Sequence, residues 1–150
     1  MWHLLKYRIY FRILLFLHQP NYLKTSIPVQ IRFLTCVFPF VIRSSIDLAL
    51  LENIFLKEEY LLPTDFIPKI VIDLGANIGL SALYFRAKYP LSRIIAVEPD
   101  PKNLVSLHSN IVRAQGIDVV PRAIHSKNGL ELELFRDPMS HWSTSSVQKK

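Results

Sequence analysis

Two carboxylates and two glycines have the types and spacing of a nucleoside-binding site. Asp73 lies two residues before Gly75, and Gly79 follows four residues after that glycine. Glycine allows positive φ and lets a ligand approach the backbone, so this loop could surround a ligand. Glu98 lies 25 residues beyond Asp73. It could accept hydrogen bonds from both hydroxyls of a ribose and would repel a 2′-phosphate, which predicts a nucleoside with an unphosphorylated ribose.

These residues fall at the ends of elements that would bring them together. Residues 70–72 are β-branched without a polar residue, which is typical of a parallel strand buried on both faces. A helix near Gly79–Tyr89 follows the loop, and Pro90 closes it from behind. A second apolar run, residues 94–97, leads to Glu98. We therefore expect a βαβ unit with its site at the carboxyl ends of the two strands.

The loop differs from the glycine fingerprint of nicotinamide-binding domains. That fingerprint is G-x-G-x-x-G, whereas this chain has D-L-G-A-N-I-G, with Asn77 at the middle position. A loop of the form D/E-x-G-x-x-x-G, followed by a strand that ends in E-P-D, resembles motif I and the subsequent acid of class I S-adenosylmethionine-dependent methyltransferases. A nicotinamide-dinucleotide-binding oxidoreductase domain is the alternative enzyme class.

The resemblance can be narrowed to one family. The runs D-L-G-A-N-I-G-L-S and A-V-E-P-D-P-K-N-L, with the L-x-x-N of Leu107–Asn110, are similar to the FkbM family of methyltransferases. Upstream, Arg43 and Asp47, followed by an apolar helix and Tyr60, also resemble that family. The resemblance covers roughly residues 37–134.

The resemblance implies a fold and a cofactor. The fold is α/β, an incomplete Rossmann-like class I methyltransferase fold. It is the βαβαβ half of a seven-stranded sheet with strand order 3-2-1-4-5-7-6, preceded by an N-terminal helical extension. The cofactor is S-adenosyl-L-methionine, whose methyl group would pass to a hydroxyl on a small metabolite, sugar or polyketide. The residues implied to bind it are Asp73, Gly75, Ala76, Asn77, Gly79, Glu98 and Pro99.

Three of these residues have a structural alternative. Asp73 could orient the loop or cap the helix instead of contacting the ligand, and Asn77 could be a turn residue that tolerates left-handed φ. Glu98 could be a solvated carboxylate at a strand end. If it binds the cofactor, we expect Glu98→Ala to weaken that binding and to leave the ligand-free protein nearly as stable.

The sequence names no catalytic base. Deprotonation of a hydroxyl needs an acid, a histidine or a lysine within hydrogen-bond reach. In this fold such groups usually come from strands four onward, and the family's later K-I-D-x-E-G-like segment is absent from the sequence. We therefore expect the chain to be truncated and inactive on its own.

Patterns before the βαβ unit predict a linker, a strand and a helix. Pro20 and Pro28 mark the linker. Residues 37–43 favour a short strand, and Ser44 or Ser45 can cap the helix that follows.

Patterns after the unit predict a second crossover and a tail. Asp100 can cap a helix that has a proline at its first position and ends at Gly116. Residues 117–120 would be the third strand. Asn128–Gly129 is a hairpin signal with alternating leucines after it. From Pro138 the sequence becomes polar, which favours a loose tail.

The positive charge is confined to the N-terminal part. The net charge is +6, and residues 1–46 contain six bases and no acid. We divide the chain into a basic, apolar helical extension over residues 1–36 and a methyltransferase part over residues 37–150. Bases interrupt residues 1–18, so no uncharged run reaches the ~18 residues of a membrane span. The segment is either a helix packed on the domain edge with snorkelling bases or a membrane-surface contact through residues 1–24.

Composition limits the remaining alternatives. A chain of 150 residues forms at most one domain. The single Cys36 cannot form an internal disulfide, so we expect a cytoplasmic protein, either free or associated with a membrane through the extension. The histidines lack metal-ligand spacing, although His125 lies near the expected place of an adenine. No recurring basic and aromatic stripe predicts nucleic-acid binding.

Two predictions concern partners. Strand one lies in the middle of the family's sheet, so without strand four its edge is open, and we expect self-association through that edge. A non-catalytic fragment that binds a membrane surface or another partner is the alternative to an enzyme.

Overall fold

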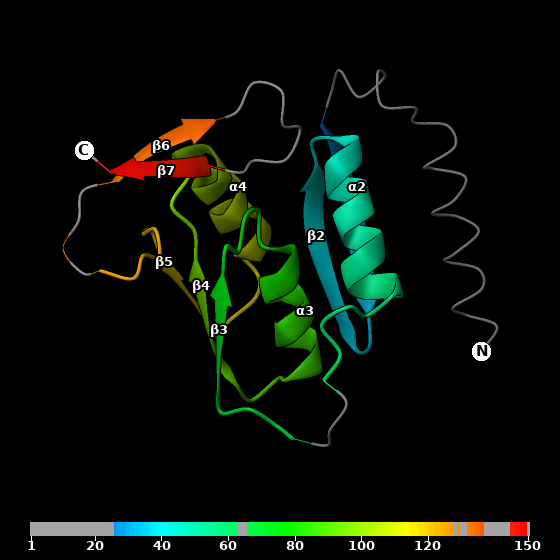
Figure 1. Cartoon of the computed structure of the whole chain (residues 1–150). Helices are drawn as coiled ribbons and strands as arrows, with labels where there is room; N and C mark the ends of the chain where they lie inside the picture. Colours follow the sequence, from blue (N-terminus) through cyan, green and yellow to red (C-terminus); the bar gives the residue numbers. More distant parts are fainter. Residues whose placement is uncertain (1–25, 63–65, 128, 130–131, 137–144, 150) are drawn as a thin grey trace.

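The computed structural model describes residues 26–62, 66–127, 129, 132–136 and 145–149. Its centre is a parallel sheet of β3 (Ile70–Leu74), β4 (Arg93–Val97) and β5 (Ile117–Val120), in the order β3-β4-β5. α3 (Leu80–Lys88) joins β3 to β4, and α4 (Pro101–Ile111) joins β4 to β5. This βαβαβ arrangement is the predicted order of elements and is compatible with part of a Rossmann-like fold (Figure 1).

Both crossover helices cover one face of the sheet (Figure 1). On that face Val71 of β3 lies beside Ile94 of β4, which lies beside Ile117 of β5. Ile94 and its neighbour but one, Ala96, are fully buried there. The small side chain of Ala96 lets the helices approach the middle strand closely.

The helix that leads to β5 begins where the sequence predicts and ends earlier. Asp100 caps α4, and its carboxylate accepts hydrogen bonds from the N–H groups of Lys102 and Asn103. The predicted end at Gly116 is wrong, because α4 ends at Ile111. Gly116 has a φ of 76°, which cannot continue a right-handed helix, and it belongs to the turn before β5.

A hairpin and a helical segment precede the sheet. β1 (Ile27–Phe33) and β2 (Cys36–Ile42) are antiparallel neighbours. α2 (Ser45–Leu51) follows and continues into η1 (Glu52–Leu56), a π-helical turn. These elements lie on the far side of α3 and α4 from the sheet, so the molecule has three layers (Figure 1).

The hairpin changes part of the prediction for the N-terminal region. The predicted strand over residues 37–43 is confirmed by β2, and Ser44 caps the next helix by accepting a hydrogen bond from the Asp47 N–H at 3.3 Å. β1, however, lies inside the extension that we predict as helical over residues 1–36, so the helical prediction is wrong for residues 27–33. The reason is that β1 alternates inward and outward residues and pairs along its whole length with β2, which the composition of residues 1–36 taken as one segment does not show. The predicted membrane-contact segment lies outside the described residues.

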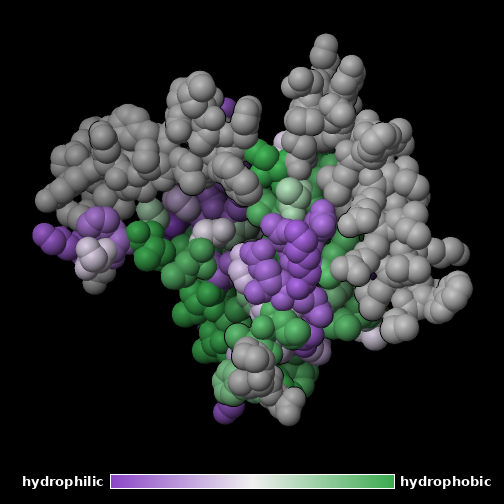
Figure 2. Space-filling model, turned by 45° about the vertical axis from the view of Figure 1, so that its right-hand side comes forward, coloured by the Kyte–Doolittle hydropathy of each residue, from purple (hydrophilic) through white to green (hydrophobic). Residues whose placement is uncertain are grey.

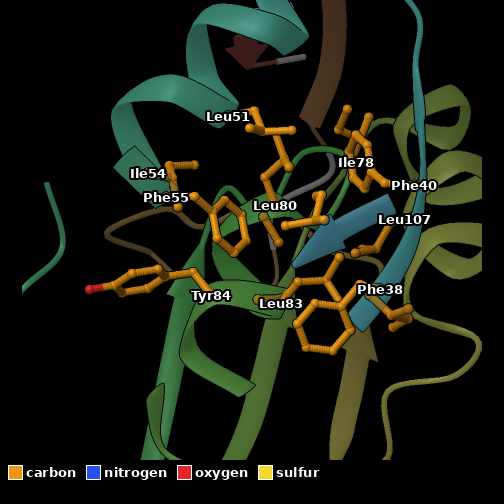
Figure 3. Close-up of a cluster of buried hydrophobic side chains, with 14 of the residues drawn as sticks. Phe38, Phe40, Leu51, Ile54, Phe55, Ile78, Leu80, Leu83, Tyr84 and Leu107 are labelled. Atoms are coloured by element: carbon orange, nitrogen blue, oxygen red, sulfur yellow. The ribbon is translucent and has the colours of Figure 1, made fainter. Parts of the chain in front are cut away.

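The core lies between the crossover helices and the hairpin (Figure 3). Phe40 of β2 and Leu107 of α4 are almost completely buried. Tyr84 of α3 is also buried, and its ring centroid lies 5.3 Å from that of Phe33 and 5.8 Å from that of Phe55. The hairpin and η1 therefore cover the surface that α3 and α4 would otherwise expose.

Arg86 of α3 joins the turns at the amino-terminal edge of the sheet. Its Nη2 donates to the carbonyl oxygens of Tyr89, at 2.5 Å, and Ser92, at 2.6 Å. Its Nη1 donates to the carbonyl oxygen of Gln115 at 3.1 Å. One guanidinium thus links the turn before β4 to the turn before β5.

The other face of the sheet is largely uncovered. Ile70, Ile72 and Leu74 of β3 are 54%, 61% and 59% exposed. Figure 2 shows a group of hydrophobic residues, coloured green, on the surface of the described part of the chain. The prediction that residues 70–72 are buried on both faces is therefore wrong for one face, since no described helix covers it. No described strand pairs with the outer edge of β3 either.

The last described elements differ from the predicted hairpin and tail. β6 (Leu132–Arg136) pairs with β7 (Ser145–Lys149) in an antiparallel ladder. The strand after the predicted Asn128–Gly129 turn therefore pairs with the segment that follows it, and the prediction of a loose tail is wrong for residues 145–149. Asn128 itself lies outside the described residues.

The helices in the described part of the chain are short or only partly apolar. None of them is both long enough and apolar enough to cross a bilayer.

We expect the open face and edge of β3 to make the protein self-associate. The substitution Ile72→Lys places a charge on this face and should lower the associated fraction at a given concentration, because a buried lysine in a contact would lose its hydration. Sedimentation velocity measures that fraction. The control is Val105→Lys on α4, which adds the same charge at a residue that is 72% exposed and lies away from this face. Equal association of the two variants would contradict the prediction.

Candidate cofactor-binding site

The loop after β3 is tied to the end of β4 by backbone hydrogen bonds. The N–H groups of Gly75 and Ala76 both donate to the carbonyl oxygen of Val97 at 2.9 Å. The N–H of Gly79 then donates to the carbonyl oxygen of Ala76 at 2.8 Å. The loop that the sequence singles out therefore has a fixed position at the carboxyl edge of the sheet.

The two glycines are needed for different reasons. A Cβ at Gly79 would lie 2.8 Å from Cδ1 of Leu107 and 3.2 Å from Cγ2 of Ile111, so Gly79 permits close packing of the loop against α4. A Cβ at Gly75 would meet nothing within 4 Å. Both have positive φ, 94° and 86°. Of the two, Gly75 is the one beside open space where a ligand could approach the backbone.

Glu98 is a buried carboxylate that holds three parts of the chain together. Glu98 is only 5% exposed. Oε2 accepts a hydrogen bond from the Asn77 N–H at 2.9 Å. Oε1 accepts from the Asp100 N–H at 2.9 Å and from Nδ2 of Asn103 at 3.3 Å. The glycine loop, the turn after β4 and the first turn of α4 therefore share one anion.

These contacts limit what Glu98 can offer a ligand. A carboxylate has about four lone-pair sites, and three are used by the bonds to Asn77, Asp100 and Asn103. One site remains, on Oε2. The expectation that Glu98 accepts from both ribose hydroxyls is thus reduced to one hydroxyl while the three bonds stay in place. The alternative of a solvated carboxylate is wrong, because the group is buried.

Asp73 is bonded to the helix that follows the loop. Its Oδ2 accepts a hydrogen bond from the Ser81 hydroxyl at 2.7 Å. Burial raises the pKa of the Asp73 carboxyl, the Ser81 hydroxyl opposes that rise, and the nearby Glu98 charge adds to it. Asp73 could either contact the ligand or have a structural role in orienting the loop or capping the helix. Its bond to Ser81 favours the structural role.

Asn77 also has the geometry of its structural alternative, a turn residue with left-handed φ. Its φ is 49°, in the left-handed region that asparagine tolerates. Its Oδ1 atom is buried and has no hydrogen-bond partner among the described residues. Such an acceptor raises the free energy of the ligand-free loop.

A cavity of about 660 Å³ lies at the carboxyl ends of β4 and β5, and of the seven predicted site residues Pro99 is the one that lines it. Pro99, Val97 and Val120 contribute to its wall. Arg122 and His125 come from the segment after β5, and Nδ1 of His125 accepts a hydrogen bond from the Lys127 N–H at 3.2 Å. The cavity has the size of a small-ligand site.

The seven predicted residues gather at one edge of the sheet, but they differ in access. Gly75 is exposed, and Asp73, Asn77 and Pro99 are half-buried. The other three, Ala76, Gly79 and Glu98, are buried. None of these observations tests whether the residues bind a cofactor, so the assignment stays a prediction.

Sequence reasoning missed the partners of Glu98. Asn103 was recognised only as part of a motif run, and its link to Glu98 depends on the helix cap at Asp100, which turns the third residue of α4 back toward the strand end. The D-P-x-N spacing was the available signal. Within the described residues, no group of three or more His, Cys, Asp or Glu side chains could hold a metal ion.

Comparisons with known proteins place the chain near methyltransferases over short stretches. The chain matches no known protein-family model. It is 55% identical over 31 residues to methyltransferase sdnD of Sordaria araneosa, which is 21% of this chain and 12% of that protein. It is 42% identical over 41 residues to methyltransferase 1 of Beauveria bassiana, which is 27% of this chain and 16% of that protein.

A third match is to a much larger protein. The chain is 38% identical over 48 residues to the AMB antimetabolite synthetase AmbE of Pseudomonas aeruginosa, which is 32% of this chain and 2% of AmbE. All three matched stretches span less than a fifth of the relative's own length. Together with the fold, the two fungal matches support a methyltransferase-like protein and, in general terms, the use of S-adenosylmethionine.

We expect Asp73→Asn to raise thermal stability at neutral pH. A carboxyl whose pKa is raised on folding stabilises the protein below its unfolded pKa, and that contribution is lost as pH rises through the folded pKa. The amide keeps an acceptor for Ser81 and does not ionise. The difference in thermal midpoint between variant and wild type should therefore be largest at neutral pH and disappear below about pH 4. Glu59→Gln, at an exposed carboxylate, is the control. A difference that does not change with pH would contradict the assignment.

We expect Glu98→Ala to destabilise the ligand-free protein, in contrast to the sequence-based expectation. The substitution leaves three N–H donors without their acceptor, and a buried unpaired donor costs about 1–3 kcal/mol. For a chain of this size the thermal midpoint should fall by at least about 3 °C. Calorimetry measures the shift, with Glu59→Ala as the control that removes the same charge from the surface. Equal midpoints for the two variants would show that Glu98 is not the anchor described above.

Proposed function

We propose that the chain carries the cofactor-binding half of an S-adenosylmethionine-dependent methyltransferase of the FkbM type. The observation that supports this most is the hydrogen bond between the Asn77 N–H and Glu98, 2.9 Å long. It joins the D-L-G-A-N-I-G loop and the E-P-D-P turn, the two motifs that carry the resemblance, in one site. The short matches to fungal methyltransferases support the same class.

The chemical groups at the site suit S-adenosylmethionine. The open side of Gly75 leaves room for a ligand against the backbone. The remaining acceptor site on Glu98 suits a ribose hydroxyl, and the unpaired Oδ1 of Asn77 would gain a donor if the loop adjusts to a ligand. The apolar wall of the cavity, with Pro99 and Val120, suits a flat base.

S-adenosylmethionine supplies an activated methyl group when it is bound. The chain's own part is to position it and to surround it with suitable charge. Asp73 and Glu98 place negative charge beside the glycine loop, which would favour a cationic sulfonium there. Arg122 and Lys127 line the adjoining cavity. The acceptor we propose is a hydroxyl on a small metabolite, sugar or polyketide, as in the family that the sequence resembles.

The proposal predicts that S-adenosylhomocysteine binds more tightly than NAD or NADP. Isothermal titration of the full chain with each nucleotide measures the three affinities. Gly75→Ala should weaken S-adenosylhomocysteine binding at least about tenfold, which is ~1.4 kcal/mol of binding free energy, because the methyl group occupies the open side of the loop. The thermal midpoint of the ligand-free variant reports backbone strain separately. Tighter binding of NAD would replace the proposal with the oxidoreductase alternative.

A further inference from the structure

Two buried asparagines lie on the same side of α4. Asn103 is 2% exposed and Asn110 is 3% exposed. They are seven residues apart, close to two helical turns, so their side chains leave the helix in nearly the same direction. Neither is explained by the hydrophobic core, since a buried amide costs free energy unless it is hydrogen-bonded.

Asn103 connects Arg43 to Glu98. Its Oδ1 accepts a hydrogen bond from Nη1 of Arg43 at 3.4 Å. Its Nδ2 donates to Oε1 of Glu98 at 3.3 Å. Since a guanidinium only donates and a carboxylate only accepts, the orientation of this amide is determined by its partners.

Asn110 makes the same kind of connection two turns later. Its Oδ1 accepts a hydrogen bond from the Val41 N–H at 3.2 Å. Its Nδ2 donates to the carbonyl oxygen of Ile78, in the glycine loop, at 2.9 Å. Each asparagine therefore accepts from the chain around Arg43 and donates to the candidate site.

The chain around Arg43 is itself a fixed unit, which we call the arginine segment, residues Val41–Asp47. The backbone N–H of Arg43 donates to Oδ2 of Asp47 at 2.7 Å, and its Nε donates to the same oxygen at 3.3 Å. Asp47 is 2% exposed. Nη1 of Arg43 also donates to the hydroxyl of Ser106 at 3.2 Å. A partly buried ion pair thus orients the guanidinium toward α4.

We propose that Asn103 and Asn110 are positioning residues, two amide bridges that couple the docking of the arginine segment to the shape of the glycine loop and of Glu98. Arg43 acts on the site through Asn103, because its loss would release Asn103 and through it Glu98. The predicted effect on nucleotide affinity rests on the proposed function. The predicted effect on the conformation of the glycine loop does not rest on it.

The coupling is tested first without any ligand, by amide hydrogen exchange of the full chain. In Arg43→Met the guanidinium is lost, and exchange of the Asn77 N–H, which donates to Glu98, should accelerate at least about fivefold relative to wild type. Ser106→Ala is the matched control, since it removes another acceptor of the same guanidinium and leaves the bridge through Asn103 intact. Asn110→Ala should accelerate exchange at Gly79 in the same way.

The amide of Ile95, in the middle strand, separates local from global opening. A similar acceleration at Ile95 and Asn77 would mean that Arg43 serves stability alone, and it would overturn the proposal. Unchanged exchange at Asn77 in Arg43→Met would overturn it as well.

The second test uses S-adenosylhomocysteine and the pH dependence of its affinity. Asn103→Asp places a second carboxyl against Glu98, so at pH 8 the affinity should fall at least about tenfold below wild type. As the pH falls, one proton shared by the two carboxyls restores a donor to Glu98, and the affinity should recover toward the wild-type value at the same pH. The other charged groups that face this position are Arg43 and Asp47 from the arginine segment and Asp100 from the turn after β4.

Asn103→Ala supplies no donor at any pH, so its affinity should stay low throughout the range. If the affinity of Asn103→Asp for S-adenosylhomocysteine is as low as that of Asn103→Ala at every pH, the positioning role is overturned. If wild type binds no S-adenosylhomocysteine, the proposed function fails, and the exchange measurements alone decide the coupling.

Discussion

The structure depends most on one buried anion. Placing a carboxylate where it is 5% exposed costs free energy unless hydrogen-bond donors surround it. At Glu98 the donors come from the glycine loop, the turn after β4 and the first turn of α4. These three segments reach the same carboxylate because β3 and β4 are parallel neighbours and α4 begins at their carboxyl ends. The geometry of the edge is therefore a consequence of satisfying one charge.

α4 extends this constraint to the rest of the molecule. One of its sides supplies Leu107, which packs against Gly79, and the two asparagines that contact the loop. The same asparagines hold the arginine segment. The hairpin covers the helices as a third layer, so the core of Figure 3 and the site edge share α4 as a common wall.

The sequence predicted the parts of the fold whose causes are local. A glycine loop, a capping aspartate with a proline after it, and three short apolar runs define β3, α3, β4, α4 and β5. It failed where the cause lies in distant neighbours. Ile72 has the residue type of a buried strand, but its exposure depends on whether a second layer of helices is present. β1 was hidden because pairing with β2 determines its state. Likewise the seven site residues were found together, whereas the bonds that occupy Glu98 required the position of Asn103.

The charges at the two edges of the sheet have a consequence for the kind of ligand that the fold accepts. The amino-terminal ends of α3 and α4 carry partial positive charge, which in many nucleotide-binding folds attracts a phosphate. At α4 this charge is balanced within the chain, because Asp100 accepts from the N–H of Lys102 and Glu98 accepts from the N–H of Asp100. Arg86 balances the carbonyls at the opposite edge in the same way. A pyrophosphate would have to compete with carboxylates that are already in place. The first turn of α4 is thus electrostatically compensated before any ligand arrives, so its N–H groups are already bonded and do not offer a ready-made phosphate site.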